Sequence, residues 1–156
     1  MDSGLDENER SVLKRLERHG WFVNVIAEDR VGSGFAYSFG LYERFRHPEI
    51  IICGLPADTM QTLVNDVGQK VSDGVRYKSG DNARDLAEGR TCTFRDVNPV
   101  VYSETFTWAV WFYGNQEFPA LQLFWPDKQD RFPWDPKFDE HLRHRQLNLC
   151  ELPISR

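Results

Sequence analysis

His47 has the side chain best suited to acid–base chemistry in this sequence. It lies in a charged turn with Glu43 and Glu49, between apolar runs at residues 35–41 and 50–55. A neighbouring carboxylate can orient an imidazole as a general base, so this turn is a candidate site. Because no nucleophile accompanies it, the favoured interpretation is that His47 forms hydrogen bonds that hold the turn.

Residues 125–136 form a second candidate site because they combine aromatic and acidic side chains. The segment reads WPDKQDRFPWDP and contains Trp125, Asp127, Trp134 and Asp135. Tryptophan on a loop that prolines hold rigid is a good anchor for a partner or a flat ligand. The favoured alternative is that the indoles fold back to cover the core. Asp127 and Asp135 have the chemistry of a hydrolytic pair, if the fold sets them at the right separation.

Glu104 and Tyr37 are further candidate binding residues in apolar surroundings. Glu104 belongs to residues 100–113, a run that is apolar almost all round. An unpaired buried carboxylate is costly, so an exposed edge is favoured for Glu104, and burial would make it the first site candidate. Tyr37 lies on the aromatic face of residues 35–41. The other face carries small residues, which allow close approach of a packed helix, the favoured alternative, or of a ligand.

Metal and cofactor sites are not predicted. His141 and His144 have a spacing that could present two ligands on one helical face, but no third ligand completes the set, and a solvated face is the better interpretation. The glycine-rich residues 32–34 precede a strand, whereas a phosphate-binding loop needs a following helix. The local motifs GxSxG, HExxH and Walker A are absent from the sequence. No catalytic residue is therefore assigned.

Composition narrows the classes of function. The chain has 156 residues, 40% of them hydrophobic and 28% charged, which is the balance of one globular domain. A net charge of −5 argues against nucleic-acid binding and suits a soluble protein or one that meets a basic partner. The acidic N-terminus lacks a signal peptide, and no run is long enough to span a membrane. Three widely spaced cysteines fit reduced thiols, so a cytoplasmic protein is expected.

The strongest structural signal is an apolar run at residues 50–53, which has no polar alternation. Three consecutive isoleucines predict a strand covered on both faces, at the centre of a sheet. A helix over residues 6–19 is predicted from the N-cap and N3 spacing of Asp6 and Glu9, with Gly20 as its stop. Apolar residues at helical spacing predict a second helix over residues 56–71, lying across the sheet.

The remaining elements are predicted from weaker patterns. We expect a hairpin of residues 21–27 and 35–41, and a strand over residues 118–125. A strand pair is predicted over 75–78 and 90–97, with a loop or helical turn over 82–88 between them. A helix is predicted over 100–113, with a strand as the alternative for the aromatic residues 105–113. A short helix over 138–142 and a docked edge strand over 147–154 complete the chain. The sequence thus predicts a single compact α+β domain over residues 1–156, with three helices on a mainly antiparallel or mixed sheet of about six strands.

Four segments together resemble a known family. They read YSFGLYERFRHPEIIICGLP, TLVNDVGQKVSDG, WAVWFY and FPALQLFWPDKQDRFPWDP. In order and spacing they are similar to the largely bacterial family called domain of unknown function 4262, over a core of residues 20–136. The helix at 6–19 and the tail at 137–156 lie outside the resemblance. Ser38-Phe39 stands where the family pattern favours Thr-Val. The family carries no known activity, so the resemblance implies one compact domain and transfers no catalytic residue.

Two functional hypotheses of different classes follow. The first is a non-catalytic binding protein, of the immunity type that neutralises a basic toxin through an acidic, aromatic surface. The second is a small-molecule or nucleotide-binding enzyme with a pocket near His47, Glu49, Glu104 and Trp134. The first hypothesis is favoured, because the chain has surplus tryptophan and no catalytic signature.

Overall fold

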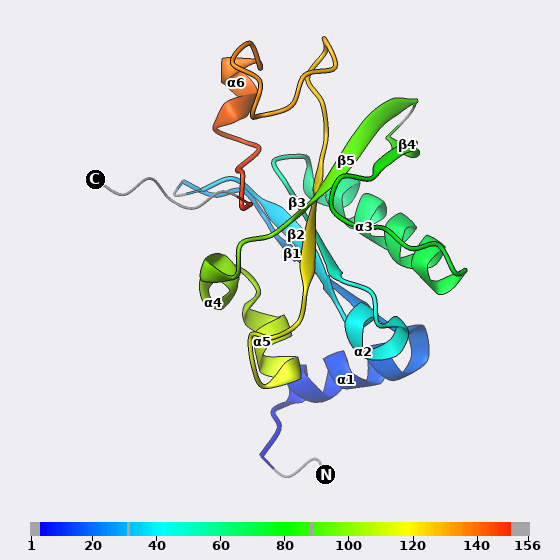
Figure 1. Cartoon of the computed structure of the whole chain (residues 1–156). Helices are drawn as coiled ribbons and strands as arrows, with labels where there is room; N and C mark the ends of the chain where they lie inside the picture. Colours follow the sequence, from blue (N-terminus) through cyan, green and yellow to red (C-terminus); the bar gives the residue numbers. More distant parts are fainter. Residues whose placement is uncertain (1–3, 31, 88, 151–156) are drawn as a thin grey trace.

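A mixed sheet of six strands forms the centre of the computed structural model, which describes residues 4–30, 32–87 and 89–150 (Figure 1). The elements in chain order are α1 Glu7–His19, β1 Phe22–Ile26, β2 Phe35–Phe39, α2 Leu41–Phe45, β3 Glu49–Cys53, α3 Ala57–Ser72, β4 Asn82–Ala87, β5 Arg90–Asp96, the 3-10 turn η1 Pro99–Val101, α4 Tyr102–Thr105, α5 Thr107–Tyr113, β6 Ala120–Phe124 and α6 Glu140–Arg143. The predicted α+β class and six-stranded mixed sheet are confirmed. The described residues hold six α-helices rather than three, because several short ones were not separated in the sequence.

The strand order is β1-β2-β3-β6-β5-β4, and β3 and β6 form a parallel pair with Ile50 opposite Leu121. The other neighbouring strands pair antiparallel. All five residues of β3 are buried, which confirms the central strand. Because β3 and β6 run parallel at the middle of the sheet, their carboxyl ends lie at the same end of the sheet.

Each face of the sheet is covered by its own layer of helices. Because side chains alternate along a strand, Ile50 and Ile52 pack on one face with α3, whereas Ile51 and Cys53 pack on the other face with aromatic residues of α4 and α5. Figure 1 shows α3 on one side of the sheet and α4 and α5 on the opposite side, with α1 beneath. The core therefore consists of two layers, one on each face of the sheet.

Helix α1 begins and ends where the sequence predicts. Asp6 and Glu9 form a reciprocal capping box, with hydrogen bonds of 2.7 Å and 2.9 Å between each side chain and the other residue's backbone N–H. Gly20 ends the helix in the left-handed conformation. This start was predictable because a capping box is a local device, independent of the rest of the fold.

Helix α3 lies directly on the sheet because Gly68 leaves room for an indole. A Cβ atom at Gly68 would lie 2.6 Å from Cε2 of Trp21, closer than packed carbon atoms approach. The Trp21 Nε1–H donates to the Asn65 side chain at 3.0 Å, which fixes the ring against the helix. Pro56 is the N-cap rather than the first helical residue that the sequence suggested.

The predicted strand over residues 75–78 is wrong, and so is the prediction of a loop or helical turn over residues 82–88. The fourth strand is Asn82–Ala87, an edge strand that pairs with β5 along one side. The Tyr77 N–H and the Arg76 guanidinium instead bond to groups in residues 45–47. The polar sequence NARDLA concealed β4, because edge strands tolerate residues that central strands exclude.

The predicted continuous helix over residues 100–113 is interrupted at Phe106. This residue has φ −97° and ψ 46°, outside helical geometry, and its side chain is fully buried. The Trp108 N–H, freed at the start of α5, donates to the buried hydroxyl of Tyr37 at 2.9 Å. The run is less buried than its composition suggested, since Val100 is 60% exposed and Trp108 and Trp111 are half-buried.

The tail docks through the Gln122 side chain and one backbone hydrogen bond, from the Asn98 N–H to the Leu149 carbonyl at 2.9 Å, rather than as the predicted edge strand over residues 147–154. The buried Gln122 amide donates to the carbonyl of Leu147 at 2.6 Å and accepts from the N–H of Leu149 at 2.9 Å. Residues 147–150 have no strand assignment, and residues 151–154 lie outside the described part of the chain. The short helix predicted over 138–142 is α6.

Candidate ligand-binding groove

A groove of about 740 Å³ lies at the end of the sheet where the central strands β3 and β6 finish. Leu55 follows β3 and Trp125 follows β6, and both line the groove, as does the N-terminal half of α3. In open α/β sheets, ligands commonly bind outside the carboxyl ends of parallel strands, and the single parallel pair here has a groove at the same place. The volume is in the range of small-molecule sites. Its lining residues are Leu55, Asp58, Thr59, Thr62, Leu63, Asp66, Leu86, Arg90, Trp125, Pro126, Asp127, Lys128 and Leu142.

Trp125 forms a fixed part of the groove floor. Its indole N–H donates to the carbonyl of Cys53 at 2.7 Å, and its backbone exchanges two hydrogen bonds with the Gln146 amide, at 2.9 Å and 2.8 Å. The side chain is 7% exposed. This geometry agrees with the favoured interpretation that the indole covers the core, and it leaves part of that cover facing the groove.

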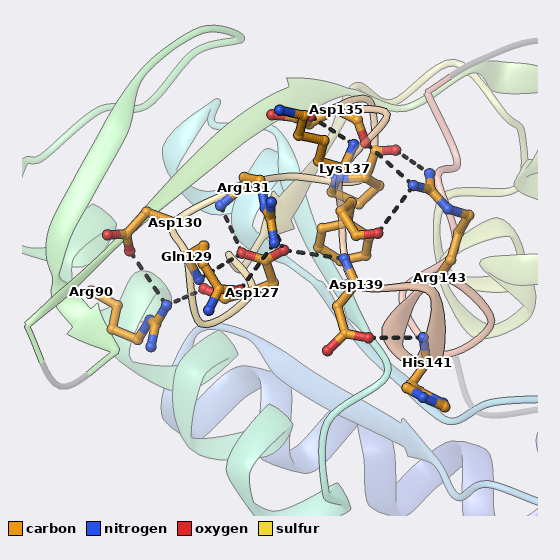
Figure 2. A network of polar contacts seen from close by, with 12 residues as sticks. Arg90, Asp127, Gln129, Asp130, Arg131, Asp135, Lys137, Asp139, His141 and Arg143 are labelled. Atoms are coloured by element: carbon orange, nitrogen blue, oxygen red, sulfur yellow. Dashed lines mark hydrogen bonds and ion pairs between the residues drawn. The ribbon is translucent and has the colours of Figure 1, made fainter.

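Asp127 holds the loop that forms one wall of the groove. One carboxylate oxygen accepts from the backbone N–H groups of Gln129 and Arg131, and the other accepts from the Arg131 Nε–H and the Asp139 N–H, at 2.9–3.1 Å. Figure 2 shows Asp127 at the centre of these contacts. Burial acts to raise the pKa of Asp127, but the four donors outweigh it and lower the pKa below the ordinary value. The carboxylate is thus a structural anion.

Arg90 reaches the groove from the start of β5 and is held there by the same loop. Its Nη2 donates to the backbone carbonyl of Asp127 and to the Asp130 carboxylate, the latter at 3.3 Å (Figure 2). Its Nε is buried and has no hydrogen-bond partner among the described residues. Other parts of the Arg90 side chain, which is 39% exposed, are open to solvent beside the groove.

Trp134 and Asp135 occupy other parts of the same loop and do not line the groove. The Trp134 ring stacks on Phe132 and meets Phe124 edge-on, with the Arg95 guanidinium 3.5 Å from its centroid. The Asp135 carboxylate accepts from the N–H of Lys137. Within the described residues no contact joins the carboxylates of Asp127 and Asp135, which have separate partners (Figure 2).

Glu49 is the centre of a second polar cluster, at the amino end of β3. One carboxylate oxygen accepts from the Ser38 hydroxyl at 2.8 Å; the other accepts from the Tyr113 hydroxyl and from two N–H groups at the start of α2, those of Gly40 and Tyr42. Burial raises the pKa of Glu49 to about 7, although these hydrogen bonds oppose the shift. Gly40 has φ 108°, so glycine is suited to this turn.

His47 has partners on both ring nitrogens. Its Nε2 accepts from the Tyr77 N–H at 2.9 Å, so Nδ1 carries the hydrogen and donates to the Pro48 carbonyl at 2.8 Å. Burial lowers the pKa of the imidazole, with a further contribution from Arg76. The arrangement agrees with the favoured role of holding the turn, since a neutral imidazole is what these two bonds need.

The eight predicted site residues do not gather at one place. Trp125 and Asp127 line the groove; Glu49 lies in the cluster at the other end of β3, and Tyr37 is buried beneath α5. Glu104 is exposed on α4, as favoured in the sequence interpretation. In the described part of the chain, no hydrogen bond, ion pair or ring contact joins any two of His47, Glu49, Glu104 and Trp134.

A comparison with protein families places this architecture. A family model described as "Domain of unknown function (DUF4262)" matches residues 15–139, most of the chain. The chain belongs to the DUF4262 family. The match contains the core of residues 20–136 on which the resemblance rests, and it contains every groove residue except Leu142. The curated proteins and the solved structures that were searched gave no match to this DUF4262 chain.

Sequence reasoning missed most of the residues that make the groove of this DUF4262 chain. Leu55 and Leu63 belonged to the predicted central run and the helix after it, and Leu86 to the predicted loop or helical turn. Neither these residues nor Arg90 and Lys128 were candidates for a site. The missing signal was the parallel pairing of β3 with β6, which brings residues 54–66 beside residues 125–128.

The structure shows no metal site: among the described residues, no three His, Cys, Asp or Glu side chains are grouped to hold an ion. None of the described helices has the length and apolar sequence needed to cross a bilayer.

Proposed function

We propose that this DUF4262 chain is a non-catalytic binding protein whose ligand is a small organic molecule held in the groove. The observation that carries the proposal is the position of the groove, outside the carboxyl ends of two adjacent parallel strands and beside the first turns of α3. Rigid β-strand ends and a pinned loop form its walls, so the site needs little reorganisation to accept a ligand. Aliphatic and indole surface supplies affinity, and charged residues at the rim supply selectivity.

A binding role is favoured over an enzymatic one by the state of the acid–base candidates. Both nitrogens of His47 have partners, and the oxygens of Glu49 and Asp127 accept structural hydrogen bonds. General acid–base catalysis needs a group that can reach a substrate atom. Of these three residues, Asp127 alone lines the groove, and its carboxylate already has four donors.

A matched pair of substitutions on α3 tests the proposal. Thr62 is exposed and lines the groove, whereas its neighbour Gln61 is exposed and lies outside it. A metabolite library is screened for compounds that raise the melting temperature, since a ligand of the native state stabilises it. Thr62→Trp, which places an indole in the groove, is expected to abolish these shifts, and Gln61→Trp to leave them intact. A library with no stabilising compound, or shifts that survive Thr62→Trp, would contradict the proposal.

A second candidate function is neutralisation of a basic protein such as a toxin. It is supported by a hollow of about 250 Å³ between α1 and α5, where Asp6 and Glu9 lie beside Trp108 and Trp111. Half-buried indoles with adjacent carboxylates suit a basic surface. Size-exclusion chromatography with the product of the adjacent gene tests it: a co-eluting complex that Trp108→Ala weakens is expected, and separate elution would count against the idea.

The proposal includes a cytoplasmic, bacterial setting for this function. Its support is the state of Cys53 and Cys92, which are both free thiols. Proteins of oxidising compartments commonly use their cysteines in disulfides, so free thiols favour a reducing one. Fractionation of cells that produce the protein at its natural level checks the setting, and recovery outside the cytoplasm would contradict it.

A further inference from the structure

Two cations line the groove from outside α3: Arg90 belongs to β5 and Lys128 to the loop after β6. We propose that the ligand is an amphipathic organic monoanion, whose anionic group is bound by Arg90 and Lys128 and whose apolar body lies on Leu55, Leu63, Leu86 and Trp125. This inference rests on the proposed function and specifies its ligand.

Arg90 carries the inference because its guanidinium is positioned but incompletely paired. The backbone carbonyl of Asp127 orients the group, while the buried Nε has no acceptor in the described residues. Its ion pair with Asp130 is easily exchanged, since the Asp130 side chain is 78% exposed and exposed ion pairs are weak. A guanidinium that is oriented at a cavity wall and partly exposed is suited to a carboxylate, sulfonate or phosphate group.

Lys128 adds a second positive charge at the same wall. It is exposed, and no ion pair engages its ammonium group in the part of the chain that the structure describes. The nearby Asp127 carboxylate does not cancel this charge, because it already pairs with Arg131. The positive wall therefore consists of one oriented guanidinium and one adaptable ammonium.

The carboxylates that α3 contributes to the groove limit the ligand to one negative charge. Asp58 and Asp66 line the groove from exposed positions on α3. A second anionic group at that side would meet two carboxylates and be repelled. The apolar lining consists of the leucine side chains and the Trp125 ring. An apolar ring system or chain of the ligand would be stabilised there, because its surface is removed from water.

Two fluorescent probes isolate the contribution of the anionic group. 1-Anilinonaphthalene-8-sulfonate and N-phenyl-1-naphthylamine have the same rings and differ by the sulfonate. The wild-type chain is expected to bind the anionic probe about fivefold more tightly than the neutral one, as a partly exposed charge-assisted contact would give. Arg90→Gln is expected to remove most of this preference, and Lys128→Gln a smaller part. Asp130→Asn, which keeps the guanidinium and frees it, is expected to retain or increase the preference.

The outcomes separate this inference from the proposed function. Equal binding of the two probes by the wild-type chain, or an unchanged ratio in both Arg90→Gln and Lys128→Gln, overturns the monoanion while the groove remains a binding site. Binding of both probes that Thr62→Trp does not reduce overturns the groove itself. Lys128 is exposed and its substitution leaves the core untouched, so the test stands even if Arg90→Gln fails to fold.

Discussion

The hydroxyl of Tyr113 donates a hydrogen bond to the buried carboxylate of Glu49, across 64 positions of sequence. The same hydroxyl accepts from the N–H groups of Gly40 and Glu43, at 3.2 Å each. One phenol therefore ties α5 to the amino end of β3 and to the start of α2. No cation pairs with Glu49 among the described residues, so its charge depends on these neutral donors.

The contribution of Glu49 to stability is predicted to fall as pH rises through the range in which Glu49 ionises. The pKa of Glu49 rises from its ordinary 4.5 to about 7 in the folded chain. Between these values the folded state binds more protons than the unfolded state, so the free energy of unfolding decreases with increasing pH, by about 3 kcal/mol from this group. Glu49→Gln should lack this decrease, because an amide can accept at one position and donate to Ser38 at the other. Urea unfolding from pH 4.5 to 8 measures it, with Glu104→Gln as the exposed control, and parallel profiles for Glu49→Gln and wild type would contradict it.

Tyr113→Phe is predicted to destabilise the chain by about 1–3 kcal/mol at pH 8, because it removes a donor from a buried charge. The loss should be smaller at pH 5, where Glu49 is protonated, since the pKa of Glu49 then rises further without this hydrogen bond. Chemical denaturation at the two pH values provides the measurement. Tyr42→Phe is the control, since no hydrogen bond engages the Tyr42 hydroxyl in the described residues, and an equal loss in both variants would argue against the assigned role.

Gly68→Ala is predicted to destabilise the chain by about 1–3 kcal/mol, although alanine is the better helix former. The added methyl group would overlap the Trp21 ring, at 2.6 Å from Cε2. Gln61→Ala on the exposed side of α3 is the control and should be neutral or slightly stabilising. Thermal unfolding of the two variants decides the point: a stabilised Gly68→Ala chain would mean that α3 can move away from the sheet at little cost.

Asp127→Asn is predicted to cost about 2–4 kcal/mol, because an amide nitrogen would face two of the four donors that now meet the carboxylate. Asp135→Asn is the matched control, since one backbone N–H meets its carboxylate. The stability that Asp127 contributes should also be lost as pH falls through its lowered pKa, in the acid range. Thermal unfolding of both variants at pH 7 tests the difference, and equal melting temperatures would refute it.

The sequence predicted elements that local chemistry specifies. The capping box of Asp6 and Glu9 and the apolar run of β3 each determine their own structure, and both are confirmed. Elements that depend on distant contacts were predicted less well. Strand β4 is stabilised by β5 along one side, and α2 is held by Glu49, so neither has a strong signal of its own. The break at Phe106 follows from the buried environment of its ring, which the run 100–113 does not reveal.

The candidate site was predictable in part. Trp125 and Asp127 stood out by residue type and do line the groove. Their neighbours there come from α3, β4 and β5, which the parallel pairing of β3 and β6 brings to the same edge. Register and strand order set this convergence, and residue spacing does not encode them directly. Glu49 was a candidate for chemistry, but its partner Tyr113 lies at the end of a helix whose position only the fold gives.

The pairing of β3 with β6 also has a consequence for synthesis of the chain. Strands β1, β2 and β3 are made first, and residues 54–119 must follow before β6 can take its place between β3 and β5. Until then the edge of Glu49–Cys53 has unpaired backbone groups and apolar side chains, which can template association with another nascent chain. A fragment that ends before residue 120 is therefore expected to aggregate. Strand β6, the last to be made, protects the apolar strand β3.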